Sequence, residues 1–213
     1  MKKLLGCFLV VLGVVGLGVA SAATAKSNVY GVLVGGQGNL PDLDNTLKDL
    51  HVGWVRQNVP LGNTTQDLAR YLKDGANLVI TISNNDATNS DTTYGTPKDY
   101  PNAGFPYKDK KVYQDKIRNI IKPLTPYLSS GRKIMVQAEN EVGDASVSDG
   151  SRYWRGDLTQ YSRQVQALYE AVKSVNSRFT VVLTSFASET LDAAIDPKDP
   201  KYTYAQSKIT TLL

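Results

Sequence analysis

The sequence is poor in the residues that most often build metal sites and disulfides. Among its 213 residues there is one cysteine, Cys7, and one histidine, His51. A lone histidine does not make a zinc site, so we expect a packing or solvation role for His51. Cys7 lies in an N-terminal segment that we expect to be removed, which would leave no thiol, disulfide or cysteine metal site. We therefore expect neither a metal nor an organic cofactor.

The N-terminus has the pattern of a secretory signal peptide. Two lysines precede an apolar run from residue 4 to residue 20, and small residues follow it. The pattern predicts a signal peptide over residues 1–25, cleaved after Ala22 or Ala25, and hence a secreted or periplasmic protein with no stable membrane insertion after processing. A membrane anchor is the alternative, but the run is short and rich in glycine.

The charge of the chain gives no sign of a nucleic-acid or anionic-lipid partner. The formal net charge is +4 at pH 7, and Lys2 and Lys3 supply part of it. The remaining excess is small and scattered, without blocks of like charge, so no nucleic acid is expected to bind. Residues 26–213 are long enough to form one globular domain with a sizeable core. Their oligomeric state stays open.

From residue 28 the chain alternates between short apolar runs, typical of strands, and amphipathic segments, typical of helices. Strands are expected at residues 29–34, 54–59, 78–82, 134–136 and 179–183. Helices are expected from Pro41 to Leu50, from Thr64 or Thr65 to Gly75, over 113–121 before Pro123 and Pro126, over 158–175, and at 204–213.

Five strand–helix units in succession predict parallel strands with right-handed crossovers, so the expected fold class is α/β. An open doubly wound sheet and a (β/α)8 barrel both fit this alternation. A complete barrel takes about 250 residues, and the sequence stops inside an amphipathic pattern at 209–213. We therefore expect the N-terminal five units of a (β/α)8 TIM barrel, in a chain truncated after the fifth unit.

Two carboxylates flank an amide just after the predicted strand at 134–136. Glu139 and Glu141 are two of the four glutamates in the sequence, and Asn140 lies between them. In parallel α/β proteins the reactive groups sit at the carboxyl ends of the strands, so we expect functional residues here. On an ideal strand Glu139 would point to the same side as Glu141 but lie deeper, where it could pair with Arg56 or Lys133 and hold the site together.

The segment from Gln137 to Gly143, Gln-Ala-Glu-Asn-Glu-Val-Gly, resembles a segment of clan A retaining glycoside hydrolases, which are (β/α)8 barrels. It is particularly similar to the Gln-x-Glu-Asn-Glu-aromatic-Gly segment of β-galactosidase-type members, although Val142 replaces the aromatic residue. The resemblance implies a glycosidase with Glu141 as general acid/base and Asn140 as partner of the sugar 2-hydroxyl. It also implies that Arg56, in the second predicted strand, orients the nucleophile. In the clan that nucleophile is a glutamate after the seventh strand, outside this sequence.

The residue types suit such chemistry. Glycosidic cleavage needs one carboxylic acid to protonate the leaving oxygen and one carboxylate to attack or to activate water. Glu141 can be the acid if a semi-buried site raises its pKa, because desolvation penalises the charged form. Glu189 follows the fifth predicted strand, but a role in loop or helix-start solvation is favoured for it. Glu170 falls on the exposed face of a predicted helix.

Two loops on the expected catalytic side, at 84–107 and at 144–154, carry residue types that bind sugars. The loop at 84–107 begins with Asn84 and combines amides and carboxylates with four aromatic residues. A loop this long inside a compact domain is usually functional. The alternative is a polar insert whose aromatic residues pack into the core. Asn58, at the end of the second strand, and Trp154, which could equally pack at a helix start, are further candidates for substrate binding.

The predicted partner is therefore a carbohydrate substrate. A non-catalytic exported carbohydrate-binding protein on the same α/β fold is the main alternative, and an open-sheet binding protein that is complete as written is another. The motif from Gly36 to Pro41 does not make a dinucleotide fingerprint, because proline replaces its third glycine.

Overall fold

The computed structural model describes residues 30–34, 43–64, 66–143 and 153–184. The strands are β1 (Gly31–Val34), β2 (Trp54–Pro60), β3 (Asn77–Ser83), β4 (Ile134–Ala138) and β5 (Thr180–Val182). The helices are α1 (Leu43–Asp49), α2 (Ala69–Lys73), α3 (Lys110–Ile121), the 3-10 helix η1 (Lys122–Leu124), α4 (Thr125–Ser129) and α5 (Leu158–Val175). The predicted α/β alternation is confirmed.

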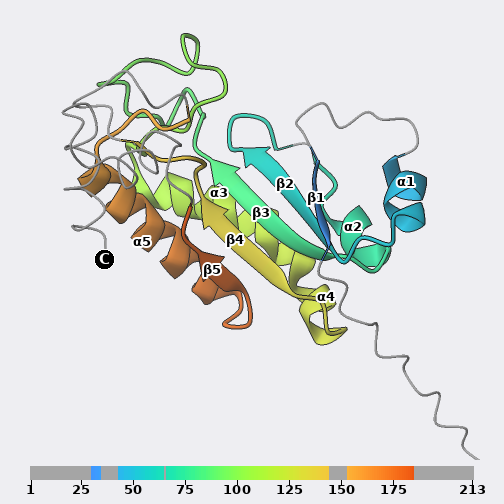
Figure 1. Cartoon of the computed structure of the whole chain (residues 1–213). Coiled ribbons are helices and arrows are strands. Elements are labelled where there is room, and N and C mark those ends of the chain that lie inside the picture. The colour runs from blue at the N-terminus through green and yellow to red at the C-terminus, as the bar shows by residue number, and fades with distance from the viewer. Residues whose placement is uncertain (1–29, 35–42, 65, 144–152, 185–213) are drawn as a thin grey trace, which may run out of the picture.

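The five strands form one parallel sheet in the order β1-β2-β3-β4-β5. Right-handed crossovers that always step in the same direction place the connecting helices on one face of a sheet. Figure 1 shows α3 and α5 lying together against the sheet in this way. A doubly wound sheet reverses its direction at a switch point. The order of the five described strands has no reversal, so they do not form the doubly wound alternative.

The burial pattern along β2 shows which face the helices cover. Val55, Gln57 and Val59 are buried, whereas the residues that alternate with them are only half-buried. Gln57 faces the helices, because its Oε1 accepts a hydrogen bond of 3.0 Å from the Tyr71 hydroxyl of α2. Arg56 therefore lies on the opposite face of the sheet, together with the other half-buried residues of β2.

The two long helices bury an apolar stripe and have capped N-termini. Asp109 caps α3, because its Oδ1 accepts from the backbone N–H of Lys111 at 2.7 Å and of Val112 at 3.1 Å. Asp157 and Gln160 form a capping box at the start of α5. Side-chain caps satisfy N–H groups that have no partner within the helix, which stabilises these helix starts. No helix among the described residues is long and apolar enough to span a membrane.

Two details of the helices differ from the prediction. Thr64 does not cap α2, which begins at Ala69 and whose first N–H donates to Asp67 Oδ1 at 3.1 Å. The α-helix α3 does end at Ile121 as predicted, but two further helical turns that were not predicted follow it, with Pro123 and Pro126 in the first turns of η1 and α4. Proline is tolerated there, since the N–H that it lacks would have no helical partner.

Several predictions fall on residues outside the described part of the chain. These are the signal peptide at 1–25, the turn after β1, most of the loop at 144–154, the helix at 204–213, Thr65 and Glu189.

Candidate functional site

The sheet face opposite the helices changes character along the strands. Near the amino ends it carries apolar side chains, including Trp54, Val79 and Met135, which help to line a hollow of about 360 Å³. Arg56 also lines this hollow, and Thr81 follows Val79 on the same face, nearer the carboxyl end of β3. The polar groups therefore lie toward the carboxyl ends of the strands, where parallel α/β proteins place their reactive groups.

Arg56 links β2 to β3 and to the turn that follows β4. Its Nε donates to Thr81 Oγ1 of β3 at 3.0 Å, and its Nη2 donates to Asn140 Oδ1 at 2.6 Å. A guanidinium donor makes a hydrogen bond stronger than a neutral one, so these contacts fix the Asn140 amide in one orientation. Arg56 and Asn140, which are separated by 84 positions in the sequence, are thus brought together.

The backbone turns sharply where β4 ends. The strand stops at Ala138, and both Glu139 (φ 59°) and Glu141 (φ 42°) adopt left-handed conformations. Residues other than glycine rarely adopt them, at a cost of about 1 kcal/mol each. Strand alternation therefore ends before the glutamates, so the ideal-strand geometry expected for them does not apply, although Glu139 does lie deeper than Glu141. Glu141 is half-buried here.

Glu139 is fully buried and held at both backbone and side chain. Its N–H donates to the Ile82 carbonyl of β3 at 2.8 Å, and its carbonyl accepts from Gln137 Nε2 at 2.8 Å. Its side-chain Oε1 accepts from the Asn84 N–H at 3.0 Å and from Gln164 Nε2 of α5. Burial raises the pKa of Glu139 to about 8, against the opposing effect of these two hydrogen bonds.

The expected partners of Glu139 are therefore wrong. Arg56 reaches Asn140 instead, and Lys133 lies before β4 begins, at the opposite end of that strand. The physical reason is the turn at Glu139, which directs its side chain between β3, the following loop and α5.

Gly104 completes the pocket around the Glu139 carboxyl group. A Cβ atom added to Gly104 would lie 1.5 Å from Glu139 Oε2, so only glycine fits at this position. The Gly104 N–H donates to the Tyr153 carbonyl at 2.9 Å, and its carbonyl accepts from the Arg155 N–H at 2.9 Å. The loop after β3 and the segment before α5 are thus joined directly beside Glu139.

The loop at 84–107 uses its amides internally. Asn84 is fully buried, and its Nδ2 donates to the Phe105 carbonyl at 2.9 Å. Asn89 is also buried and bonds to the backbone of Asp109 through both ends of its amide. Buried backbone groups need partners, and a loop without strand pairing obtains them from its own side chains. Asn84 therefore supports the loop, and its buried side chain does not present a group to a substrate.

The aromatic residues of this loop also contact protein. Phe105 is fully buried, and the Tyr107 ring stacks on Tyr113 with centroids 5.3 Å apart. The Tyr100 ring lies 4.0 Å from the Arg155 guanidinium. These contacts match the alternative interpretation of the loop, in which its aromatic residues pack into the core.

Trp154 packs in the same way. It is fully buried, its ring meets Tyr161 edge-on at 5.8 Å, and its Nε1 donates to the Asp157 carbonyl at 3.3 Å. Its role is to pack at the start of α5, so it does not line an open site. Asn58 is half-buried, lies on the same sheet face as Arg56 and pairs in register with Thr81. Arg56, Asn58 and Asn140 thus remain the candidate substrate-binding residues beside Glu141.

Sequence reasoning missed Gln164 and Gly104. Gln164 is fully buried on the apolar stripe of α5, between Tyr161 and Leu168. A glutamine on such a stripe needs a buried partner, and this was an available signal. Gly104 carried no signal, because its contact with Glu139 joins residues far apart in the sequence.

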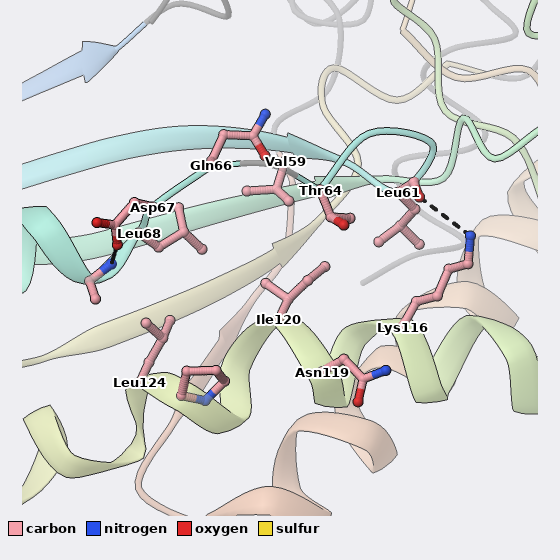
Figure 2. A pocket seen from close by; sticks show the side chains of 12 residues that line it. Val59, Leu61, Thr64, Gln66, Asp67, Leu68, Lys116, Asn119, Ile120 and Leu124 are labelled. Atoms are coloured by element: carbon pink, nitrogen blue, oxygen red, sulfur yellow. Dashed lines mark hydrogen bonds between the residues drawn. The ribbon is translucent and has the colours of Figure 1, made fainter.

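A second hollow lies away from these residues. Figure 2 shows it between the segment after β2 and α3, and its volume is about 340 Å³. Leu61, Ile120 and Leu124 line this hollow, and Lys116 Nζ donates a hydrogen bond of 3.4 Å to the Leu61 carbonyl at its edge.

The described residues contain no group of three or more histidine, cysteine or acidic side chains that could hold a metal ion. His51 is exposed.

Comparison with known proteins finds distant likeness to solved structures alone. No protein-family model matches the sequence, and no curated protein matches it. Among solved structures, the chain is similar to the GH53 catalytic domain of Ignisphaera aggregans, with a TM-score of 0.43 and 20% sequence identity. The alignment covers 78% of this chain and 49% of that one, so the chain spans about half the length of the structure that it matches.

Proposed function

We propose that the protein is an exported glycoside hydrolase that cleaves O-glycosidic bonds with net retention, and that Glu141 is its general acid/base. The observation that carries this proposal is the hydrogen bond of 2.6 Å from Arg56 to Asn140, which joins two of the residues named by the sequence resemblance at the turn that also carries Glu141. In this proposal residues 1–25 are removed on export, and the sheet is the first five units of a (β/α)8 barrel.

The orientation of Asn140 supports a role in sugar binding. Because its Oδ1 accepts from Arg56, its Nδ2 is left as a donor. An amide held in this way can donate to a sugar hydroxyl and gains specificity because it does not reorient. The guanidinium group of Arg56 also favours negative charge in a nearby nucleophile.

The proposed reaction has two steps. In the first, a carboxylate outside this sequence attacks the anomeric carbon, the glycosidic C–O bond breaks, and Glu141 gives its proton to the leaving oxygen. In the second, Glu141 takes a proton from water, the water oxygen bonds to the anomeric carbon, and the enzyme carboxylate is released. The proton and the carboxylate return to their starting positions, so no cofactor is consumed.

The test compares glycosides whose leaving groups differ in acidity, using the full-length gene product. Glu141→Gln should lower turnover of glycosides with poor leaving groups by about 10²- to 10⁴-fold, because the proton donor is lost from a nearly isosteric site. Glycosides with acidic phenol leaving groups need less protonation and should be affected less in the first step. Added azide, a nucleophile that needs no general base, should restore turnover of those substrates.

Glu170→Gln is the matched control, because Glu170 is a half-buried residue of α5 that pairs with Lys110 at 2.7 Å. Unchanged turnover in Glu141→Gln would remove Glu141 from the mechanism. Sugar binding by the wild-type protein without hydrolysis of any glycoside would instead favour a non-catalytic carbohydrate-binding protein.

A further inference from the structure

We propose that Glu139 is a positioning residue, a neutral carboxylic acid that clamps the turn presenting Asn140 and Glu141, and that loss of its proton releases this turn. The inference rests on the proposed function for its effect on catalysis. The clamp itself rests only on contacts within the described residues and is tested separately.

The clamp connects the turn to three neighbouring elements. The backbone of Glu139 is bonded to Ile82 of β3 and to the Gln137 side chain of β4. Its side chain adds the Asn84 N–H and the Gln164 amide of α5. A residue held at two backbone and two side-chain points has little freedom to relax from its left-handed conformation, so the residues that follow it are presented in one orientation.

The surroundings of the second carboxyl oxygen favour the neutral acid. Glu139 Oε2 is buried beside Gly104 and has no hydrogen-bond partner among the described residues. None of the ion pairs in this part of the chain includes Glu139. A buried carboxylate without a cation or a full set of donors is strongly disfavoured relative to its protonated form. The raised pKa of about 8 agrees with this geometry.

Among the described residues, the charged and titratable groups around the clamp do not supply a compensating cation. Tyr113 of α3 and Tyr161 of α5 lie close enough to Glu139 to interact with it electrostatically. Burial raises the pKa of both hydroxyl groups, so they stay neutral while Glu139 titrates. The guanidinium of Arg56 is bonded to Thr81 and Asn140. A negative charge on Glu139 would therefore have two hydrogen-bond donors but no cation among the described residues, and its desolvation would favour opening of the turn toward water.

The clamp is tested by NMR on the full chain labelled with ¹³C at the glutamate carboxyl carbons. The printed sequence holds four glutamates, so the signals are few, and the signal lost in Glu139→Gln identifies Glu139. We expect this signal to titrate with a midpoint near 8, and the amide signals of Asn140 and Glu141 to shift with the same midpoint. In Glu139→Gln those two amides should not shift over that range. Glu170→Gln should leave the shifts as they are in the wild type.

Two NMR outcomes would overturn the inference, whatever the enzymatic activity. One is a midpoint for Glu139 near the ordinary value of about 4.3. The other is a titration near pH 8 that leaves the amides of Asn140 and Glu141 unmoved. If Glu139→Gln does not fold, the wild-type titration of these amides still decides between the outcomes.

The catalytic consequence is read from pH profiles of hydrolysis. We expect the wild-type kcat to fall about tenfold for each pH unit above the Glu139 midpoint, as a single deprotonation requires. The limb with the Glu139 midpoint should be absent in Glu139→Gln, where only a limb from the general acid Glu141 remains, and a limb that keeps the Glu139 midpoint in this variant would refute the proposed regulation. Absence of hydrolysis in the wild type would instead count against the proposed function, while the NMR titration would still decide whether the clamp exists.

Discussion

Replacing Glu139 with glutamine should remove a pH dependence from the stability of the protein. Glutamine has nearly the shape of the neutral acid, and its amide oxygen can accept from the Asn84 N–H and the Gln164 amide as Glu139 Oε1 does. Unlike the acid, it cannot ionise. The variant therefore isolates the effect of holding a buried carboxyl group in its protonated form.

The size of the effect follows from proton linkage. The pKa of Glu139 rises from 4.5 to about 8 on folding, so between these values the folded state binds more protons than the unfolded state. The stabilisation is fully present below the unfolded pKa and is lost as the pH rises through the folded one. The slope approaches about 1.4 kcal/mol per pH unit. The wild type should therefore lose about 3 kcal/mol relative to Glu139→Gln between about pH 5.5 and pH 8.

The assay is chemical denaturation of the full-length protein at several pH values, followed by circular dichroism. Groups common to both proteins cancel when the unfolding free energies are subtracted. Glu170→Gln is again the control, because Glu170 lies on the surface and its pKa is lowered, first by the hydrogen bond from Lys110. The difference in unfolding free energy between Glu170→Gln and the wild type should stay constant over this pH range. Parallel curves for the wild type and Glu139→Gln would refute the assignment of a buried neutral acid.

Three further predictions concern the supports of the site. Gly104→Ala should destabilise the protein by at least about 2 kcal/mol in the same assay, because the new methyl group would overlap the Glu139 carboxyl group. Gly131→Ala, which meets no atom within 4 Å but has a φ of +87°, should cost only about 1 kcal/mol, and an equal loss in both would contradict the overlap. Burial would raise the pKa of Asp86, but hydrogen bonds, first that from Lys116, hold it below its usual value. Asp86→Asn should therefore be less stable than the wild type at pH 7, and the difference should shrink as the pH falls through the folded pKa; a pH-independent difference would exclude an ionised Asp86 as its cause. Asp157→Ala should lower the unfolding free energy by about 1 kcal/mol through loss of the capping box on α5, and a change below about 0.3 kcal/mol would show that the cap contributes little.

The strands and the long helices could be predicted because their signals are local. The stripe of α5 repeats every three or four residues from Leu158 onward, and the apolar run that became β4 is bounded by polar residues. The predicted first residue of a helix was less accurate where several residues could begin that helix. The start of α2 is an example, since Asp67 rather than Thr64 bonds to its first N–H.

The candidate site was predictable in part. The position of Asn140 and Glu141 after a buried strand, and of Arg56 inside another, follows from the rule that polar groups gather at the carboxyl ends of parallel strands. The partners of these residues did not follow from the sequence. Asn84 and Trp154 were candidates for substrate binding by residue type, yet both are fully buried and support the loops around the site.

The sequence by itself determined the strand–helix alternation and the gathering of polar residues at one strand end, because both depend on patterns within a few residues. Only the tertiary structure decided what each glutamate after β4 contacts. Two left-handed residues end the strand alternation there, and Glu139 is enclosed by Asn84, Gly104 and Gln164, which come from two distant parts of the chain. Desolvation by such long-range contacts sets the protonation of a carboxyl group, and no local pattern in the sequence records it.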